Sequence, residues 1–158
     1  MISKQKPFLG ASPDNLTTCK CKLPCKSVVV EYKCPWLHKD SEPKQAFLKP
    51  EIGGMHVDGV FSLNPSSMYY YQVQTLMLVT ELEKCHFVVW TNKGIFCHVV
   101  SIDSVFAEKI FPKVSMFWVT YVVPEMMRKL GVSNTLRLVS AIFIINRFFL
   151  YAINWIRL

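Results

Sequence analysis

One short stretch, residues 28–35 (VVVEYKCP), constrains the fold of this chain more than any other. Its three consecutive valines, residues 28–30, are typical of a β-strand that is covered on both faces. The proline at its end has no N–H to donate, so the strand ends just before it. Because side chains alternate along a strand, Glu31 and Lys33 are expected to point to one face and Tyr32 to the other. A carboxylate and an ammonium group at the end of a buried strand need partners, and a divalent metal, a phosphate and an attacking water together would be such partners.

A second acidic residue lies upstream, in a tight turn formed by residues 10–14 (GASPD). The polar residues 15–18 follow this turn, and we expect them to form a hairpin with the strand that begins at Val28. The two segments together give the pattern P-D…E-x-K.

With this pattern the sequence resembles the PD-(D/E)xK nuclease superfamily. Within it, the chain resembles the YqaJ-type viral recombinases and the lambda exonuclease, which processes the ends of double-stranded DNA. Three blocks carry the resemblance in family order: residues 10–14, residues 30–35, and residues 69–74 (YYYQVQ). Residues 87–91 (FVVWT) then follow, and the resemblance covers residues 8–126.

The resemblance implies a fold and a reaction. The fold is α/β, a restriction-endonuclease-like core in which a small mixed sheet is flanked by helices. The reaction is metal-dependent hydrolysis of DNA phosphodiester bonds by an exonuclease that acts on duplex ends in recombination or repair. Asp14, Glu31 and the carbonyl of Tyr32 would bind Mg²⁺ or Mn²⁺ through hard oxygen ligands, and the metal would activate a water. Lys33 would orient that water, and Gln72 would help to position it.

The chain departs from the family pattern before its first block. In the family a preceding helix supplies a further acidic residue to the metal site, whereas the thirteen residues before Asp14 contain no acid. We therefore expect an N-terminally truncated core with impaired activity. Two alternatives stay open: a DNA-binding remnant of such a nuclease, and a membrane-tailed protein whose nuclease likeness is only ancestral.

Charge and composition agree with a globular partner of DNA. The chain carries a formal net charge of +7, and its first fifty residues hold nine lysines against four acids. Such a basic excess favours polyanions, although it is also a common surface property. The polar N-terminus does not resemble a secretory signal, so we expect an intracellular protein, nuclear or cytoplasmic. A homo-oligomer is also compatible with the sequence.

Cysteines are frequent, and their positions are Cys19, Cys21, Cys25, Cys34, Cys85 and Cys97. Without a secretory signal, disulfides are not the default. The first three have the spacing C-x-C-x3-C, which differs from the usual paired C-x2-C of zinc sites, so we expect reduced thiols, with a structural zinc as the alternative. Cys34 is expected beneath the site, and the last two as small residues of the core.

The rest of the chain predicts further elements. Residues 64–67 are a helix start, and the helix is expected over residues 68–82. On this helix Gln72 lies on one stripe with Tyr69 and Leu76, whereas Gln74 points away and is expected to pack or to face DNA. Between the first strand and this helix we expect one or two helical turns over residues 43–48, then a loop around residues 53–59 with at most a weak strand over residues 57–63. After the helix we expect two strands, residues 85–91 and 95–102, joined by a turn that contains glycine. A final helix is expected to be capped by Asp103, bent at Pro112 and ended near Pro124.

The C-terminal segment, residues 136–158, is strongly apolar and has no counterpart in the nuclease family. We therefore divide the chain into a nuclease-like domain, residues 1–130, and a hydrophobic tail, residues 131–158. The tail is long enough to span a bilayer, but Arg147 in its middle would cost about 2.5 to 3.5 kcal/mol there. A helix packed on the domain or an altered C-terminal reading frame is favoured over a membrane tail.

Overall fold

The computed structural model of the chain describes residues 1–4, 6–20 and 25–131. It divides into two compact units, Met1–Ala107 and Glu108–Leu158, and each is described by itself. The first unit contains every predicted site residue and all the strands of the described ranges.

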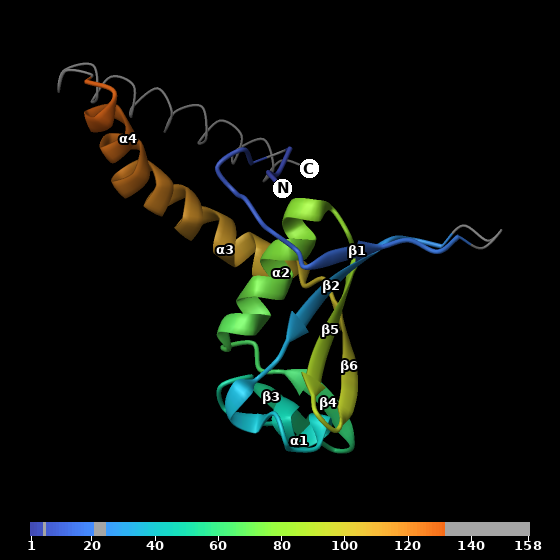
Figure 1. Cartoon of the computed structure of the whole chain (residues 1–158). Coiled ribbons are helices and arrows are strands. Elements are labelled where there is room, and N and C mark those ends of the chain that lie inside the picture. The colour runs from blue at the N-terminus through green and yellow to red at the C-terminus, as the bar shows by residue number, and fades with distance from the viewer. Residues whose placement is uncertain (5, 21–24, 132–158) are drawn as a thin grey trace. The chain divides into compact units, whose positions relative to one another are not determined.

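A four-stranded mixed sheet forms the centre of the first unit, in the order β1-β2-β5-β6 (Figure 1). Its strands are β1 (Asn15–Thr17), β2 (Val28–Lys33), β5 (Lys84–Thr91) and β6 (Gly94–Ser101). Strand β2 pairs antiparallel with β1 and parallel with β5, which in turn pairs antiparallel with β6. The predicted hairpin into β2 is therefore confirmed, and so is the pair of later strands, whose turn places Gly94 at a φ of 139°.

One face of this sheet carries the hydrophobic core. Val29, Phe87 and Val89 point to this face and are fully buried. Helix α2 (Met68–Thr80) packs over β2 and β5, and the short helix α1 (Pro43–Phe47) packs over β5 and β6. Together they confirm the predicted α/β architecture, a small mixed sheet flanked by helices.

The opposite face of the sheet is buried at Val30 and Val88 but open toward the end of β2 and along the edge strand β6. Tyr32 is 46% exposed, and Trp90 and its partner Ile95 on β6 are 44% and 67% exposed. Cys97 on the edge strand β6 is also exposed. The prediction that Cys97 belongs to the core is therefore wrong, because strand alternation turns it away from the covered face. Cys85, which points to that face, is fully buried as predicted.

A second, two-stranded sheet joins β3 (Gly54–Val57) to β4 (Val60–Leu63) where only a loop with a weak strand was predicted. Its turn consists of Asp58 and Gly59, which have φ angles of 51° and 79°. Two successive residues with positive φ are typical of the type I′ turn that matches the twist of a hairpin. The hairpin packs beside α1, and a Cβ atom at Gly54 would lie only 2.2 Å from the carbonyl oxygen of Phe47.

Both long helices begin as predicted. The hydroxyl of Ser67 accepts a hydrogen bond from the N–H of Tyr70 at the start of α2, and α2 ends two residues before the predicted boundary. Asp103 caps the next helix by accepting a hydrogen bond from the N–H of Phe106.

The last helical segment is longer than predicted. Helix α3 (Ser104–Phe117) contains Pro112 and is followed by a π-helical turn, η2 (Trp118–Val122), and by α4 (Val123–Lys129). The prediction of an end near Pro124 is wrong: the backbone stays helical through Val122 and Val123, and Pro124 lies where the π-helical turn passes into α4.

Two predictions fall outside the described residues: the hydrophobic tail beyond residue 131, and Cys21, the central cysteine of the possible zinc ligands. Over the described ranges, no helix has the length and apolarity needed to cross a membrane.

Candidate active site

Strand β2 brings Glu31 and Lys33 together on the covered face of the sheet. Glu31 is only 2% exposed, and the ammonium nitrogen of Lys33 lies 2.5 Å from its Oε1. Strand alternation places the two side chains on one face, as predicted, and leaves Tyr32 on the other. An ion pair this deeply buried is sensitive to the loss of either partner, since the remaining charge would be uncompensated.

Helix α2 adds Gln72 to this pair. Its amide nitrogen donates to Oε1 of Glu31 over 2.6 Å, and its amide oxygen accepts from Nζ of Lys33 over 3.1 Å. The amide therefore contacts the carboxylate and the ammonium group at once. The structure brings together three of the four side chains predicted for the site.

The second carboxylate oxygen of Glu31 has a different environment. Its Oε2 is buried and has no hydrogen-bond partner among the described residues. An unsatisfied carboxylate oxygen in a buried position is costly, so such an atom calls for a ligand. A divalent cation, which prefers oxygen ligands, fits this position.

Asp14 lies at the edge of the site, directly before β1. Its Oδ2 accepts a hydrogen bond from the backbone N–H of Tyr32 over 2.7 Å. Because Asn15 is paired with Val30, Asp14 lies next to Glu31 across the ladder. Asp14 is exposed, so its other carboxylate oxygen is open to solvent or to a ligand.

Tyr69, which was not among the predicted site residues, belongs to the same cluster. Nζ of Lys33 lies 4.5 Å from the centre of its ring, in a cation–π contact. Its position three residues before Gln72, on the same stripe of α2, was the signal that could have identified it. The face of this ring contacts the ammonium group of Lys33, which also donates hydrogen bonds to Glu31 and Gln72.

Two residues near the site can be compared with their predicted places. Gln74 is a packing residue, one of its two predicted roles: it is fully buried, its amide nitrogen donates to the carbonyl of Ser101, and its amide oxygen accepts from the N–H of Asp103. Cys34 does not lie beneath the site but is exposed, because it follows Lys33 by one position and points to the opposite face.

Cys85 is the thiol that lies beneath the site. Burial, with the nearby charge of Glu31, raises the pKa of Cys85 to about 12, so this thiol stays protonated at neutral pH. Cys85 is therefore an uncharged residue of the core near the Glu31 carboxylate.

A groove with a volume of about 460 Å³ opens beside the cluster. One wall is the segment that leads to Asp14, and the other is α2, including Gln72. The lining residues are Gly10, Ala11, Ser12, Met68, Tyr71, Gln72, Thr75 and Leu76. The groove gives an extended ligand access to the edge of the cluster.

The donor set suits one divalent cation. Glu31 Oε2, the Asp14 carboxylate and the carbonyl of Tyr32 are the hard oxygens of the site. Over the described ranges, no group of three or more His, Cys, Asp and Glu side chains lies together. Asp14 and Glu31 are the two carboxylates that these ranges bring to the site.

Comparison with protein families identifies the domain. Residues 1–83 match the family of the YqaJ-like viral recombinase domain. The chain belongs to this family. The match includes Asp14, the strand with Glu31 and Lys33, and Gln72, and it confirms the family predicted from the three sequence blocks. No curated protein sequence matches the chain.

Solved structures of one protein are similar to the chain. They are crystal structures of LHK-Exo, an alkaline exonuclease from Laribacter hongkongensis, one of them in complex with dAMP. Each is 22% identical in sequence, with TM-scores of 0.45 and 0.44. The matched region covers 66% of this chain and 49% of LHK-Exo, so the chain spans about half the length of that exonuclease.

Proposed function

We propose that this YqaJ-like domain hydrolyses DNA phosphodiester bonds with Mg²⁺ or Mn²⁺, as an exonuclease on duplex ends in recombination or repair. The proposal extends to an intracellular location, nuclear or cytoplasmic, where DNA is the partner. One observation carries it: the buried Oε2 of Glu31 has no partner, while Oε1 is held by Lys33 and Gln72. Such an arrangement keeps one carboxylate oxygen ready for a cation.

The chain supplies the remaining groups for the reaction. A divalent metal held by Glu31, Asp14 and the Tyr32 carbonyl would neutralise phosphate charge and lower the pKa of water. Lys33 offers an ammonium group that can orient water or stabilise the charge that develops on the phosphate. Gln72 fixes the positions of Glu31 and Lys33 relative to each other. The groove beside Gln72 would hold the strand that is cut.

A second function, DNA binding without efficient cleavage, is favoured by the small number of acidic ligands. Only two carboxylates contribute to the site, and no group of three ligand side chains occurs among the described residues. A second metal that stabilises the leaving oxygen usually requires further carboxylates. The first function would cleave DNA repeatedly when metal is present, whereas the second would bind DNA without cleaving it efficiently.

The test is cleavage of linear and circular duplex DNA by the full chain, with Mg²⁺, with Mn²⁺ and with EDTA. We expect the linear duplex to be shortened from its ends only when metal is present. The Glu31→Gln variant keeps the size of the side chain but lacks the charge, so it should abolish cleavage. Glu81→Gln, at the exposed end of α2, is the matched control. Cleavage by Glu31→Gln at the rate of the unchanged chain would contradict the assignment, and DNA binding without turnover would favour the second function.

A further inference from the structure

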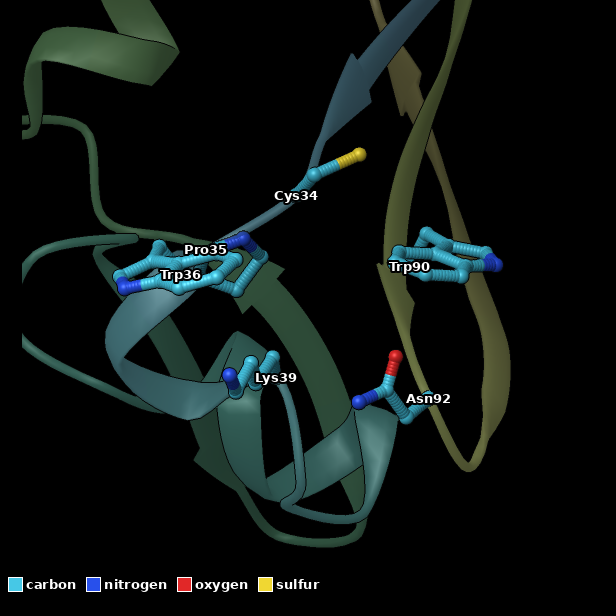
Figure 2. A pocket seen from close by; sticks show the side chains of 6 residues that line it. All are labelled: Cys34, Pro35, Trp36, Lys39, Trp90 and Asn92. Carbon is cyan, nitrogen blue, oxygen red and sulfur yellow. The ribbon is translucent and has the colours of Figure 1, made fainter.

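A second pocket lies at the carboxyl end of β2 and is lined by the residues that directly follow Lys33. Figure 2 shows two tryptophan side chains on opposite sides of it, with Cys34 at one end and a lysine and an asparagine at the other. Its volume is about 240 Å³. The lining residues are Cys34, Pro35, Trp36, Lys39, Trp90 and Asn92.

The two tryptophans reach the pocket from different elements. Trp36 begins the short 3₁₀ helix η1 (Trp36–His38), which starts immediately after Pro35. Trp90 follows Val89 on β5, and Val89 is paired with Lys33. Since Val89 is buried in the core, alternation turns Trp90 to the opposite face of the sheet.

The walls of the pocket are fixed by hydrogen bonds. The N–H of Asn92 donates to the carbonyl of Lys39 over 2.7 Å, and the side-chain amide of Asn92 donates to Asp40 over 2.8 Å. These bonds join the segment after β2 to the end of β5. The two tryptophans are therefore held on a preformed frame, which lowers the entropy cost of binding.

Both indoles remain open to solvent. Trp36 is 75% exposed and Trp90 is 44% exposed, although aromatic side chains contribute most to stability when they are buried. Nζ of Lys39 lies 4.0 Å from the centre of the Trp36 ring, and in the described part of the chain Lys39 forms no ion pair. The pocket thus combines planar rings with a positive charge that no carboxylate of the described residues neutralises.

This combination selects a class of ligand. Aromatic rings beside a cation are how proteins bind single-stranded nucleic acid, because every base has a face that can stack and every nucleotide has a phosphate. The volume of the pocket is below the range of roughly 300 to 1,000 Å³ that is typical of larger ligands, which suits a single planar base. A base paired within a duplex cannot present its faces to such a pocket without leaving the stack.

We propose that this pocket binds an unpaired nucleobase of single-stranded DNA between Trp36 and Trp90, with Lys39 next to its phosphate. The inference rests on the proposed function, since an exonuclease on duplex ends produces such a strand. Cys34 directly follows Lys33, so consecutive residues reach the pocket and the candidate active site. An unpaired strand that passes from the candidate active site beyond the carboxyl end of β2 would contact Trp36 and Trp90.

The test measures binding of the full chain to DNA in EDTA, where cleavage does not contribute. Four ligands separate the sources of the signal: a short single strand, the same strand with abasic sugars in place of nucleotides, a blunt duplex, and free dAMP. We expect the single strand to bind and to quench tryptophan fluorescence, and the abasic strand to bind much more weakly. Trp36→Ala should weaken binding of the single strand between about five-fold and a hundred-fold, which is the usual cost of one lost stacking contact.

Leu37→Ala is the matched control, because Leu37 is 80% exposed, adjoins Trp36 and does not line the pocket. Trp36→Phe keeps a stacking ring and should retain most of the affinity. Equal affinity of the Trp36→Ala and Leu37→Ala variants, or equal binding of the single and the abasic strand, would overturn the inference. Stronger binding of dAMP than of the strand would overturn it as well.

Cleavage is measured separately, so the two proposals fail in different ways. A chain that cuts DNA but binds single strands without need of Trp36 contradicts only the inference. A chain that binds single strands through Trp36 but never cuts duplex DNA contradicts the nuclease assignment and supports the pocket.

Discussion

Gln72 and Glu31 lie 41 positions apart in the sequence, and the amide nitrogen of Gln72 donates to Oε1 of Glu31 over 2.6 Å. This bond joins α2 to β2 at the centre of the candidate site. It also leaves the other oxygen of Glu31 as the one that has no partner among the described residues. The relationship therefore decides which carboxylate oxygen is presented to a ligand.

Loss of Gln72 should reduce cleavage more than it reduces stability. In Gln72→Ala, Glu31 and Lys33 keep each other but lose the amide that fixes their relative position, so we expect the rate to fall by about 10- to 1,000-fold, as for the loss of one positioned donor. The free energy of unfolding should change little because Gln72 is partly exposed. Initial rates and urea unfolding are the measurements, with exposed Gln45→Ala as the control. An unchanged rate would remove Gln72 from the site.

Gln74 should show the reverse pattern. It is fully buried and satisfies both the carbonyl of Ser101 and the N–H of Asp103. In Gln74→Leu these two backbone groups lose their partner, and each unsatisfied buried group costs about 1 to 3 kcal/mol. Urea unfolding should therefore show a clear loss of stability that Gln45→Ala does not produce. A stability equal to that of the unchanged chain would mean that the bonds are replaced by water.

The sequence predicts the elements whose signals are local. The valine run and the proline that follows define β2, the candidate cap before Met68 predicts α2, and the glycine at position 94 predicts the turn between β5 and β6. Gln72 could also be placed: helical periodicity put it on the stripe with Tyr69 and Leu76, and the family pattern directed it toward the catalytic strands. The β3–β4 hairpin was missed, although the Asp-Gly pair at its turn is a strong local signal for a hairpin.

Exposure could not be predicted in the same way. Cys34 and Cys97 look like small core residues in the sequence, and both are exposed because they lie on the face of the sheet that the described helices do not cover. Which face is covered depends on where α1 and α2 pack, and this is a long-range property. The contact between Lys33 and Tyr69 also depends on how α2 packs on β2.

The thiols should report this difference directly. Cys34 is exposed, whereas burial raises the pKa of Cys85 to about 12 and keeps the reactive thiolate scarce. Iodoacetamide at pH 8 should therefore modify Cys34 in the native chain and spare Cys85 until urea is added. Peptide mass spectrometry measures both sites, and the denatured chain is the control. Equal labelling of both in the native chain would contradict the structure.

Stability should fall on the acid side because of His98. Burial lowers the pKa of His98, which contacts the ring of Phe47 on the covered face. As the pH falls through about 6.5, the unfolded chain takes up the proton while the folded chain resists it, so the unfolded state gains stability. Urea unfolding between pH 7.5 and pH 5 should show this loss, and His98→Gln should reduce the slope. The same slope in both chains would show that His98 does not cause it.

The metal dependence should reveal how few ligands the site has. Glu31 and Asp14 are the only carboxylates placed at the site, and the described residues contain no group of three ligand side chains. Mg²⁺ dehydrates reluctantly and requires near-ideal geometry, so we expect Mn²⁺ to support faster cleavage at low concentration. Asp14→Asn keeps an acceptor for the N–H of Tyr32 but removes a charge, so the metal concentration for half-maximal rate should rise. Asp58→Asn, in the exposed β3–β4 turn, is the matched control. Half-maximal rates at equal metal concentrations for Asp14→Asn and Asp58→Asn would show that Asp14 binds no metal, and that Glu31 alone among the side chains holds it.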